Sequence, residues 1–168
     1  MQGQLDWYVV HTTPQREKTV ANQISNLGME FFLPTYKTVR QWSDRKKKVE
    51  LPLFPNYVFV HTSERERHLL FSISNLVQFV SFESKPVKVR DTEIEAVKRI
   101  LDADDDLEVG MANYFETGSK VRIARGQLAG LEGRVLKQNG KSRLLIRIDE
   151  LQKAFSINVA TNLLEAVG

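Results

Sequence analysis

The densest group of side chains able to bind a ligand lies between residues 37 and 48. Trp42 and a single acidic residue, Asp44, stand among six basic residues there. Lysine and arginine neutralise phosphate groups, and an exposed aromatic ring can stack on an unpaired base. Composition alone favours nucleic-acid binding and a solvated surface about equally, because exposed lysines also discourage edge-to-edge pairing of strands. The basic residues are Lys37, Arg40, Arg45, Lys46, Lys47 and Lys48.

Residue types that bind metals or catalyse reactions occur without the spacing that such sites need. The histidines His11, His61 and His68 do not lie as two ligands on one helix face. There are no cysteines, which excludes disulfides and thiolate metal sites. We therefore expect no metal, no cofactor and no enzymatic activity. A hydrolase or nuclease that uses the acidic residues 104–106 for magnesium is a competing hypothesis, but no nucleophile-elbow motif or ligand set supports it.

The distribution of charge divides the chain into three parts. The net charge is +4 over residues 1–101, −6 over residues 102–116 and +5 over residues 117–168. The acidic segment has no basic residue and no periodicity, which is typical of a solvated linker. We therefore expect a domain over 1–101, a flexible linker over 102–115 and a second domain over 116–168. The chain has no apolar run long enough to span a membrane and no secretory signal, so a cytoplasmic protein is expected.

Local sequence signals predict where helices of the first domain begin and end. Thr13 followed by Pro14 is typical of a helix N-terminus, because threonine caps and proline suits the first helical position. Gly28 is the expected stop of that helix. Ser63 and Glu66 form a capping box, which predicts the start of a short second helix.

Short apolar segments rich in aromatic and β-branched residues predict strands. Residues 7–10 are expected to form a buried strand and residues 53–61 the central strand of a sheet. Alternation in the central strand places Tyr57 and Phe59 on one face and Val58 on the other.

Two further stretches, residues 36–42 and 47–51, predict a hairpin that carries the basic residues at its tip. Because a hairpin joins antiparallel strands, we expect an α+β domain with a largely antiparallel sheet and helices, not a parallel doubly wound fold.

The chain after residue 116 has a different sequence pattern. Short strand-like segments alternate with turn signals, which predicts a small all-β barrel. Gly126, Gly130 and Gly133 are expected to be turn residues with unusual backbone angles. They are not a phosphate-binding loop, because no Gly-Lys-Ser/Thr follows at the required place.

The order of these segments resembles the NusG family across nearly the whole chain. Trp7–Val10 is similar to the opening strand of the family's NGN domain, and Leu53–Val60 to its central strand. Pro86-Val87 resembles the approach to that domain's last helix, and residues 121–135 resemble a KOW motif. The resemblance implies an NGN-like α+β domain followed by an SH3-like KOW barrel.

The resemblance implies a transcription elongation or antitermination factor that suppresses pausing or termination. Asn56 stands where general NusG proteins usually have glycine, and residues 147–151 look like those of specialised paralogues of the RfaH and UpxY type. Both features favour action at selected operons. Gln127 departs from the family, which often has proline there. The alternatives are a general NusG acting with the termination factor Rho and a ribosome-associated RNA-binding protein, because KOW barrels also occur in ribosomal proteins.

The family also implies which residues would contact partners. An apolar depression on the NGN domain receives the clamp helices of the largest RNA polymerase subunit; the matching residues are Trp7, Tyr8, Phe54, Pro55 and Tyr57. Contact with upstream or non-template DNA is implied for His11, Arg16, Lys37, Arg40, Arg45, Lys46, Lys47 and Lys48. Contact of the KOW barrel with a small-subunit ribosomal protein or Rho is implied for Leu151, Lys153 and Phe155.

Several of these residues have a purely structural alternative. Of Trp7 and Tyr8, one is expected in the core and the other in the wall of the depression. Arg16 also fits a solvent-facing helix side, and Phe155 fits a core position better than Leu151 does.

Overall fold

The computed structural model describes residues 3–103, 108–112, 114, 118–138 and 141–167. The chain forms two compact units, Met1–Ile94 and Glu95–Gly168. This division falls inside helix α2 (Asp91–Asp102), whereas we expected a boundary after residue 101. The acidic residues 104–106 lie outside the described residues.

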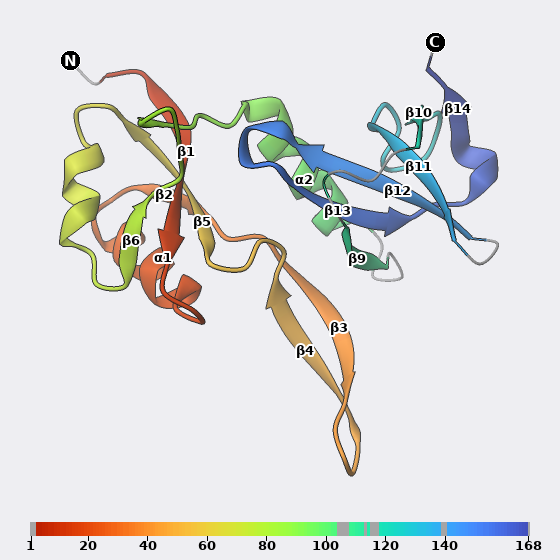
Figure 1. Ribbon diagram of the computed structural model, residues 1–168, viewed down its shortest axis with the longest axis horizontal. Helices are drawn as coiled ribbons and strands as arrows, with labels where there is room; N and C mark the ends of the chain where they lie inside the picture. Colours follow the sequence, from red (N-terminus) through yellow and green to blue (C-terminus); the bar gives the residue numbers. More distant parts are fainter. Residues whose placement is uncertain (1–2, 104–107, 113, 115–117, 139–140, 168) are drawn as a thin grey trace. The chain divides into compact units, whose positions relative to one another are not determined.

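The first unit is built on a four-stranded sheet with the strand order β2-β5-β1-β6 (Figure 1). Every neighbouring pair in this sheet is antiparallel, which confirms the predicted antiparallel arrangement. The central strands are β1 (Leu5–Thr12) and β5 (Tyr57–Ser63), and the edge strands are β2 (Glu30–Phe32) and β6 (Leu76–Phe79).

Helix α1 (Glu17–Asn26) and the 3-10 helix η1 (Arg67–Ser72) pack on the same face of this sheet. The alternate strand residues Tyr8, Val10 and Val58 are fully buried in the core between them. Each large apolar side chain removed from water in this way contributes roughly 1.5–3 kcal/mol. The helices therefore cover one face of the sheet. The intervening residues of β1 and β5 lie on the other face.

The predicted N-terminus of α1 is wrong by several residues, since the helix begins at Glu17. Thr13 does not cap it: the Thr13 backbone NH donates to the Asn75 carbonyl at 2.9 Å and its hydroxyl to the Asn75 side chain at 3.1 Å. Gln15 then adopts a φ of 62°, which is outside the helical region. Bonds to a residue distant in sequence have replaced the local cap.

The predicted C-terminus of α1 is confirmed. Gly28 has a φ of 78°, and its backbone NH donates to the Ser25 carbonyl at 2.9 Å. The Met29 backbone NH reaches back to the Ile24 carbonyl at 3.3 Å. This pair of bonds is a Schellman motif, in which the left-handed residue is usually glycine.

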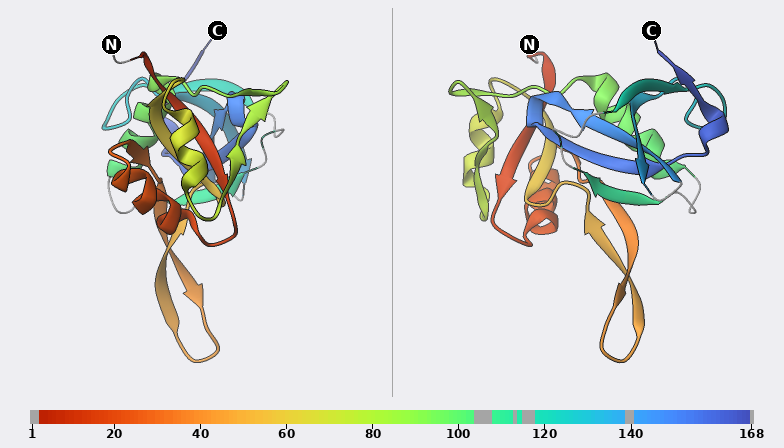
Figure 2. Two further views of the ribbon diagram at one scale, coloured as in Figure 1. Left: turned by 90° about the vertical axis from the view of Figure 1, so that its left-hand side faces the viewer. Right: turned by 45° about the vertical axis from the view of Figure 1, so that its right-hand side comes forward.

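The predicted hairpin is also present. Strands β3 (Thr35–Gln41) and β4 (Lys46–Pro52) form a two-stranded sheet of their own that projects away from the four-stranded sheet (Figures 1 and 2). A second, much shorter hairpin is formed by β7 (Ser81–Phe82) and β8 (Lys85–Pro86). The basic residues thus lie on a ribbon outside the main sheet.

Described residues of the second unit form a six-stranded antiparallel sheet with the order β14-β10-β11-β12-β13-β9. This all-β region agrees with the expected fold class. Short 3-10 helices, η2 (Asp149–Leu151) and η3 (Thr161–Leu163), follow β12 and β13. The strands are β9 (Val109–Ala112), β10 (Ser119–Ile123), β11 (Glu132–Gln138), β12 (Lys141–Ile148), β13 (Lys153–Asn158) and β14 (Leu164–Ala166).

Strand β9 lies inside the segment that we expected to be a flexible linker. It pairs with β13, opposing Val109 to Ile157 and Gly110 to Ser156. The Glu108 backbone NH extends the contact by donating to the Asn158 side chain at 3.1 Å. This four-residue segment includes a glycine and is too short to show the alternation of a strand, so its sequence does not predict one. It is a strand because it pairs with the edge of β13.

The three glycines expected in turns have two different roles. Gly126 and Gly130 have φ values of 95° and 89°, which confirms the expected turn conformations. Gly133 instead lies within β11, so its assignment to a turn is wrong. A Cβ at position 133 would lie 2.5 Å from the Leu145 carbonyl oxygen on β12.

We predict that Gly133→Ala destabilises the chain by about 1–3 kcal/mol, because the added methyl group forces β11 and β12 apart. Chemical denaturation of the full chain measures this change. Ser119→Ala, at an exposed position on the neighbouring strand β10, is the control and should stay within about 0.5 kcal/mol of the parent. Equal stability of the Gly133→Ala and Ser119→Ala chains would contradict the close-approach explanation.

Candidate functional site

The sheet face opposite the helices carries a line of ring-bearing residues. The β1–β5 register sets Trp7 opposite His61 and His11 opposite Tyr57. The Trp7 and His61 rings are stacked with centroids 4.6 Å apart, and the His11 and Tyr57 rings meet edge-on at 5.5 Å. We call this surface the aromatic face; it consists of Trp7, Val9, His11, Tyr57, Phe59 and His61.

The centre of the aromatic face is buried and one end is accessible. Phe59 is fully buried, with the rings of Phe32 and Phe54 each 5.8 Å from its own. At the end formed by the first residues of β5, Tyr57 is half-buried and Pro55 is exposed. A partner protein could therefore reach Pro55 and Tyr57 directly but not Phe54, which is 4% exposed.

Tyr8, which we expected among the partner-binding residues, lies on the opposite face of the sheet. Its side chain is fully buried in the helix-covered core, with the Arg67 guanidinium 5.1 Å from the ring centroid. Trp7, the preceding residue, is on the aromatic face because consecutive strand residues point to opposite sides. Nearby, the hydrogen bond from Lys88 to Asp6 raises the pKa of Lys88.

A strained turn supports the accessible end of the aromatic face. Asn56 has a φ of 69°, its carbonyl accepts from the Thr12 backbone NH at 2.8 Å, and its own NH donates to the buried Glu17 carboxylate at 2.9 Å. Only glycine and asparagine adopt such a φ readily. The backbone therefore explains asparagine or glycine at this position, so Asn56 does not by itself separate specialised from general family members.

Two more strained residues lie in the loops beside this turn. Gln15 and Asn75 have φ values of 62° and 69°, and the Asn75 loop is bonded to the loop that contains Gln15. Strained backbone of this kind often occurs at functional sites. His11 is half-buried and Arg16 is exposed in the same region. Sequence reasoning missed Gln15 and Asn75, because no local pattern indicates a left-handed backbone there.

The residues expected at nucleic acid fall in two separate regions. His11, near the end of β1, and Arg16, in the loop that follows, lie at one end of the aromatic face, whereas the other six lie on the β3–β4 hairpin. All six are exposed, and none forms an ion pair with another described residue. Trp42, at the tip of the same hairpin, is 53% exposed. The hairpin is therefore a surface of net positive charge, with basic side chains that are not ion-paired and an accessible indole ring.

The three residues expected to bind partners in the second unit differ in accessibility. Phe155 is fully buried, and Leu151 is 6% exposed. Lys153 alone of the three is exposed. Asp149, two residues before Leu151, accepts a hydrogen bond from the Tyr114 hydroxyl at 3.0 Å, and this bond raises the pKa of Tyr114. The structural explanation therefore fits Phe155 and also Leu151.

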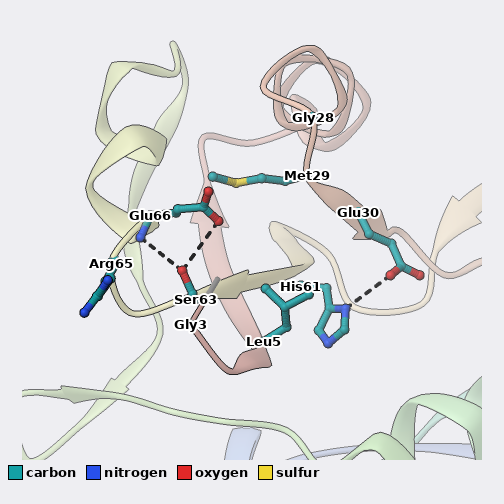
Figure 3. A pocket seen from close by; sticks show the side chains of 9 residues that line it. All are labelled: Gly3, Leu5, Gly28, Met29, Glu30, His61, Ser63, Arg65 and Glu66. Atoms are coloured by element: carbon teal, nitrogen blue, oxygen red, sulfur yellow. Dashed lines mark hydrogen bonds and ion pairs between the residues drawn. The ribbon is translucent and has the colours of Figure 1, made fainter. Parts of the chain in front are cut away.

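A cavity of about 400 Å³ lies at the other end of β5, away from Tyr57 (Figure 3). Its polar groups bind one another: the His61 imidazole lies 3.2 Å from the Glu30 carboxylate, and the Ser63 hydroxyl accepts from the Glu66 backbone NH at 3.3 Å. The bond from the Glu66 NH to the Ser63 hydroxyl is one half of the predicted capping box. The predicted helix start is wrong, however, because Ser63 is the last residue of β5 and η1 begins at Arg67 without a side-chain cap. No residue that sequence analysis assigned to a partner lines this cavity.

Within the described part of the chain, no three His, Asp or Glu residues are grouped as a metal site would require. No helix among the described residues is both long and apolar enough to cross a membrane.

The structure defines a protein of two compact units, one with an antiparallel sheet, an aromatic face and a basic hairpin, and one that contains an all-β sheet. Its candidate surfaces suit macromolecular contact. The family model described as "Transcription termination factor nusG" matches residues 5–98, which is more than half of the chain. The chain therefore belongs to the NusG family. It is a NusG-like transcription termination/antitermination factor, which confirms the general function predicted from the sequence.

Individual relatives agree with this assignment. The chain is 25% identical to the transcription termination/antitermination protein NusG of Rickettsia conorii, with 93% of this chain and 87% of the relative covered. It is 23% identical to the protein of the same name from Haemophilus influenzae, with 96% and 94% covered. A solved structure, "Domain interaction in Thermotoga maritima NusG", covers 98% of both chains with a TM-score of 0.60 and 20% identity. That likeness shows the fold alone.

We predict that Asn56→Gly leaves stability within about 0.5 kcal/mol of the parent, whereas Asn56→Ala costs about 1–2 kcal/mol, because alanine is strained at positive φ. Thermal unfolding of the full chain measures both. An Asn56→Ala chain as stable as the parent would mean that the turn relaxes to another conformation.

Proposed function

We propose that this NusG-family protein binds RNA polymerase and suppresses pausing or termination at selected operons. The accessible end of the aromatic face is the contact for the clamp helices of the largest polymerase subunit. The observation that supports this most directly is the position of Tyr57, a half-buried ring at one end of an aromatic row whose centre, at Phe59, is fully buried. Aromatic side chains in shallow depressions dominate the free energy of many protein interfaces.

The surroundings of Tyr57 suit an anchoring role. The edge contact with His11 restrains the ring, so little rotamer entropy is lost on binding. Pro55 is exposed next to it and has a rigid backbone. The turn through Asn56 is held by bonds to Thr12 and Glu17, which fixes the start of β5. A partner would therefore meet a preorganised surface.

Binding would act on transcription without any bond chemistry. A protein that bridges the clamp across the DNA channel favours the closed, elongating form of polymerase over the opened, paused form. The loops around Gln15, Arg16 and Asn75 adjoin the same end of the sheet and are the proposed contact with the non-template strand.

The second unit is proposed to be the KOW-type SH3-like barrel. Its six antiparallel strands support this assignment. A small-subunit ribosomal protein or Rho is the proposed partner, and Lys153 is the most accessible of the residues that we assigned to this contact.

A general NusG that acts with Rho is the second candidate, and the relatives named termination/antitermination proteins fit it equally well. Transcription of a Rho-dependent template with purified components separates the two. Stimulated termination by Rho indicates the general factor, whereas unchanged termination together with read-through at a selected leader sequence indicates the specialised one.

We predict that Tyr57→Ala weakens binding to core RNA polymerase by about 2–4 kcal/mol, as truncation of an interface anchor does. Tyr57→Phe should retain most of the affinity, because it keeps the ring. The matched control is Phe71→Ala, which removes an exposed aromatic ring (66% exposed) from η1 on the helix side of the sheet. A Tyr57→Ala chain that binds normally but melts at a lower temperature would place Tyr57 in the core and the interface elsewhere.

A further inference from the structure

Strand β9 closes one edge of the six-stranded sheet in the second unit, next to β13 (Figure 1). The Asn158 backbone NH donates to the Glu108 carbonyl at 3.1 Å, so these two residues form a hydrogen-bonded pair just before β9 begins. Hydrogen-bonded pairs alternate along antiparallel strands, so Gly110 and Ser156 form the next one. Without β9, β13 would be an edge strand with a row of free backbone groups.

The side chain of Arg143, on β12, reaches past β13 to β9. Its Nε and Nη2 donate to the Ser156 hydroxyl on β13 at 3.1 and 2.9 Å, and its Nη1 lies 3.8 Å from the Glu108 carboxylate. A Cβ at Gly110 would lie 2.6 Å from the same Nη2. The glycine in β9 therefore leaves the space that the Arg143 guanidinium occupies.

A second polar contact holds the chain just after β9. The Tyr114 hydroxyl donates to Asp149 at 3.0 Å, and the Arg147 guanidinium carbon lies 5.3 Å from the centroid of the tyrosine ring. The side chains of Val109 and Ala112 in β9 are only half-buried. A four-residue strand held by a short ladder and polar contacts near the surface has low local stability, and such segments open before the core does.

The pairing of β9 determines how much chain separates α2 from the six-stranded sheet. Five residues, 103–107, lie between the end of α2 at Asp102 and the bonded residue Glu108. Sixteen residues, 103–118, lie between Asp102 and the start of β10 at Ser119. At about 3.3–3.6 Å per residue, a fully extended chain spans at most roughly 20 Å in the first case and roughly 60 Å in the second.

We propose that β9 is a latch that sets how far the six-stranded sheet can reach from α2. When β9 is paired with β13, the tether is five residues long. When β9 is released, the tether is sixteen residues long and the edge of β13 is free. Tether length sets the effective concentration at which a linked module meets a second partner. This inference goes beyond the proposed function and does not depend on it, because the contacts that hold the latch all lie within the second unit.

Hydrogen exchange of the full chain, followed residue by residue, measures the opening of the latch. The Gly110 and Ala112 amides should exchange at least about 10-fold faster than the amides of β12, which is paired on both sides. Arg143→Gln should accelerate exchange in β9 by about another 10-fold, the effect of losing one charged hydrogen-bond donor. The matched control is Arg122→Gln, which removes an arginine with two carboxylate partners from β10. It should leave β9 unchanged, because β10 pairs with β11 and β14.

Locked and released forms of the chain test the reach. The chain has no cysteine, so Ala112→Cys/Ala154→Cys allows a single disulfide, across directly opposed residues of β9 and β13. Gly110→Pro is the released form, because proline cannot donate the hydrogen bond of this position. Small-angle X-ray scattering should give Gly110→Pro a radius of gyration about 2–4 Å larger than that of the oxidised double variant, because the root-mean-square length of the tether rises from roughly 13 Å to roughly 23 Å.

Protection of β9 equal to that of β12 would overturn the proposal, because β9 would then open only together with the whole sheet. Equal radii of gyration of the locked and released forms would also overturn it, because the latch would then not set the reach. If Gly110→Pro loses protection in β12 as well, the sheet has unfolded. The comparison is then made with Arg143→Gln/Tyr114→Phe, which removes both polar contacts and leaves the backbone donors intact.

Discussion

Pairing between β1 and β5 is the constraint on which the first unit depends. These two central strands are antiparallel from Leu5↔Ser63 to His11↔Tyr57. Because side chains alternate, a register shift of one residue would exchange the two faces of the strand. Burial of Tyr8 and Val58 under α1 therefore also decides that Tyr57 and Phe59 lie on the aromatic face. The core and the candidate interface are two consequences of one register.

The same pairing explains why Gln15, Asn56 and Asn75, three residues with positive φ, lie at one end of the sheet. Where β1 ends, the backbone NH groups of Thr12 and Thr13 donate to the carbonyls of Asn56 and Asn75, and both asparagines have positive φ. A left-handed backbone costs most residues other than glycine about 1–2 kcal/mol, and asparagine less. The strain persists because the strands on either side fix the ends of each turn. The result is a set of rigid loops next to Tyr57, which suits a surface that must recognise a partner without reorganising.

The β3–β4 hairpin follows different rules, because it lies outside the packed sheet. Its tip has no apolar side chains buried against a second layer, and its basic residues are exposed. Substitutions there change surface charge with little effect on the core, whereas Phe59 or Gly133 cannot be changed without disturbing packing. The first unit thus has two different surfaces. Packing fixes the side chains at the accessible end of the aromatic face, whereas positive charge and one exposed ring define the β3–β4 hairpin.

The sequence by itself determined the features that depend on neighbouring residues. Gly28 ends α1, the Glu66 NH bonds the Ser63 hydroxyl, and the basic residues lie on a hairpin, because a few adjacent residues decide each of these. Only the tertiary structure decided the features that depend on distant partners. Thr13 bonds Asn75 instead of capping α1, Val109–Ala112 becomes a strand along β13, and Gly133 is required by the Leu145 carbonyl. Likewise the sequence does not distinguish Trp7 from Tyr8, because the two residues are neighbours in one strand. The β1–β5 register places Trp7 on the aromatic face and Tyr8 in the core. The sequence of a single strand does not contain the hydrogen bonds and packing across strands that make this difference.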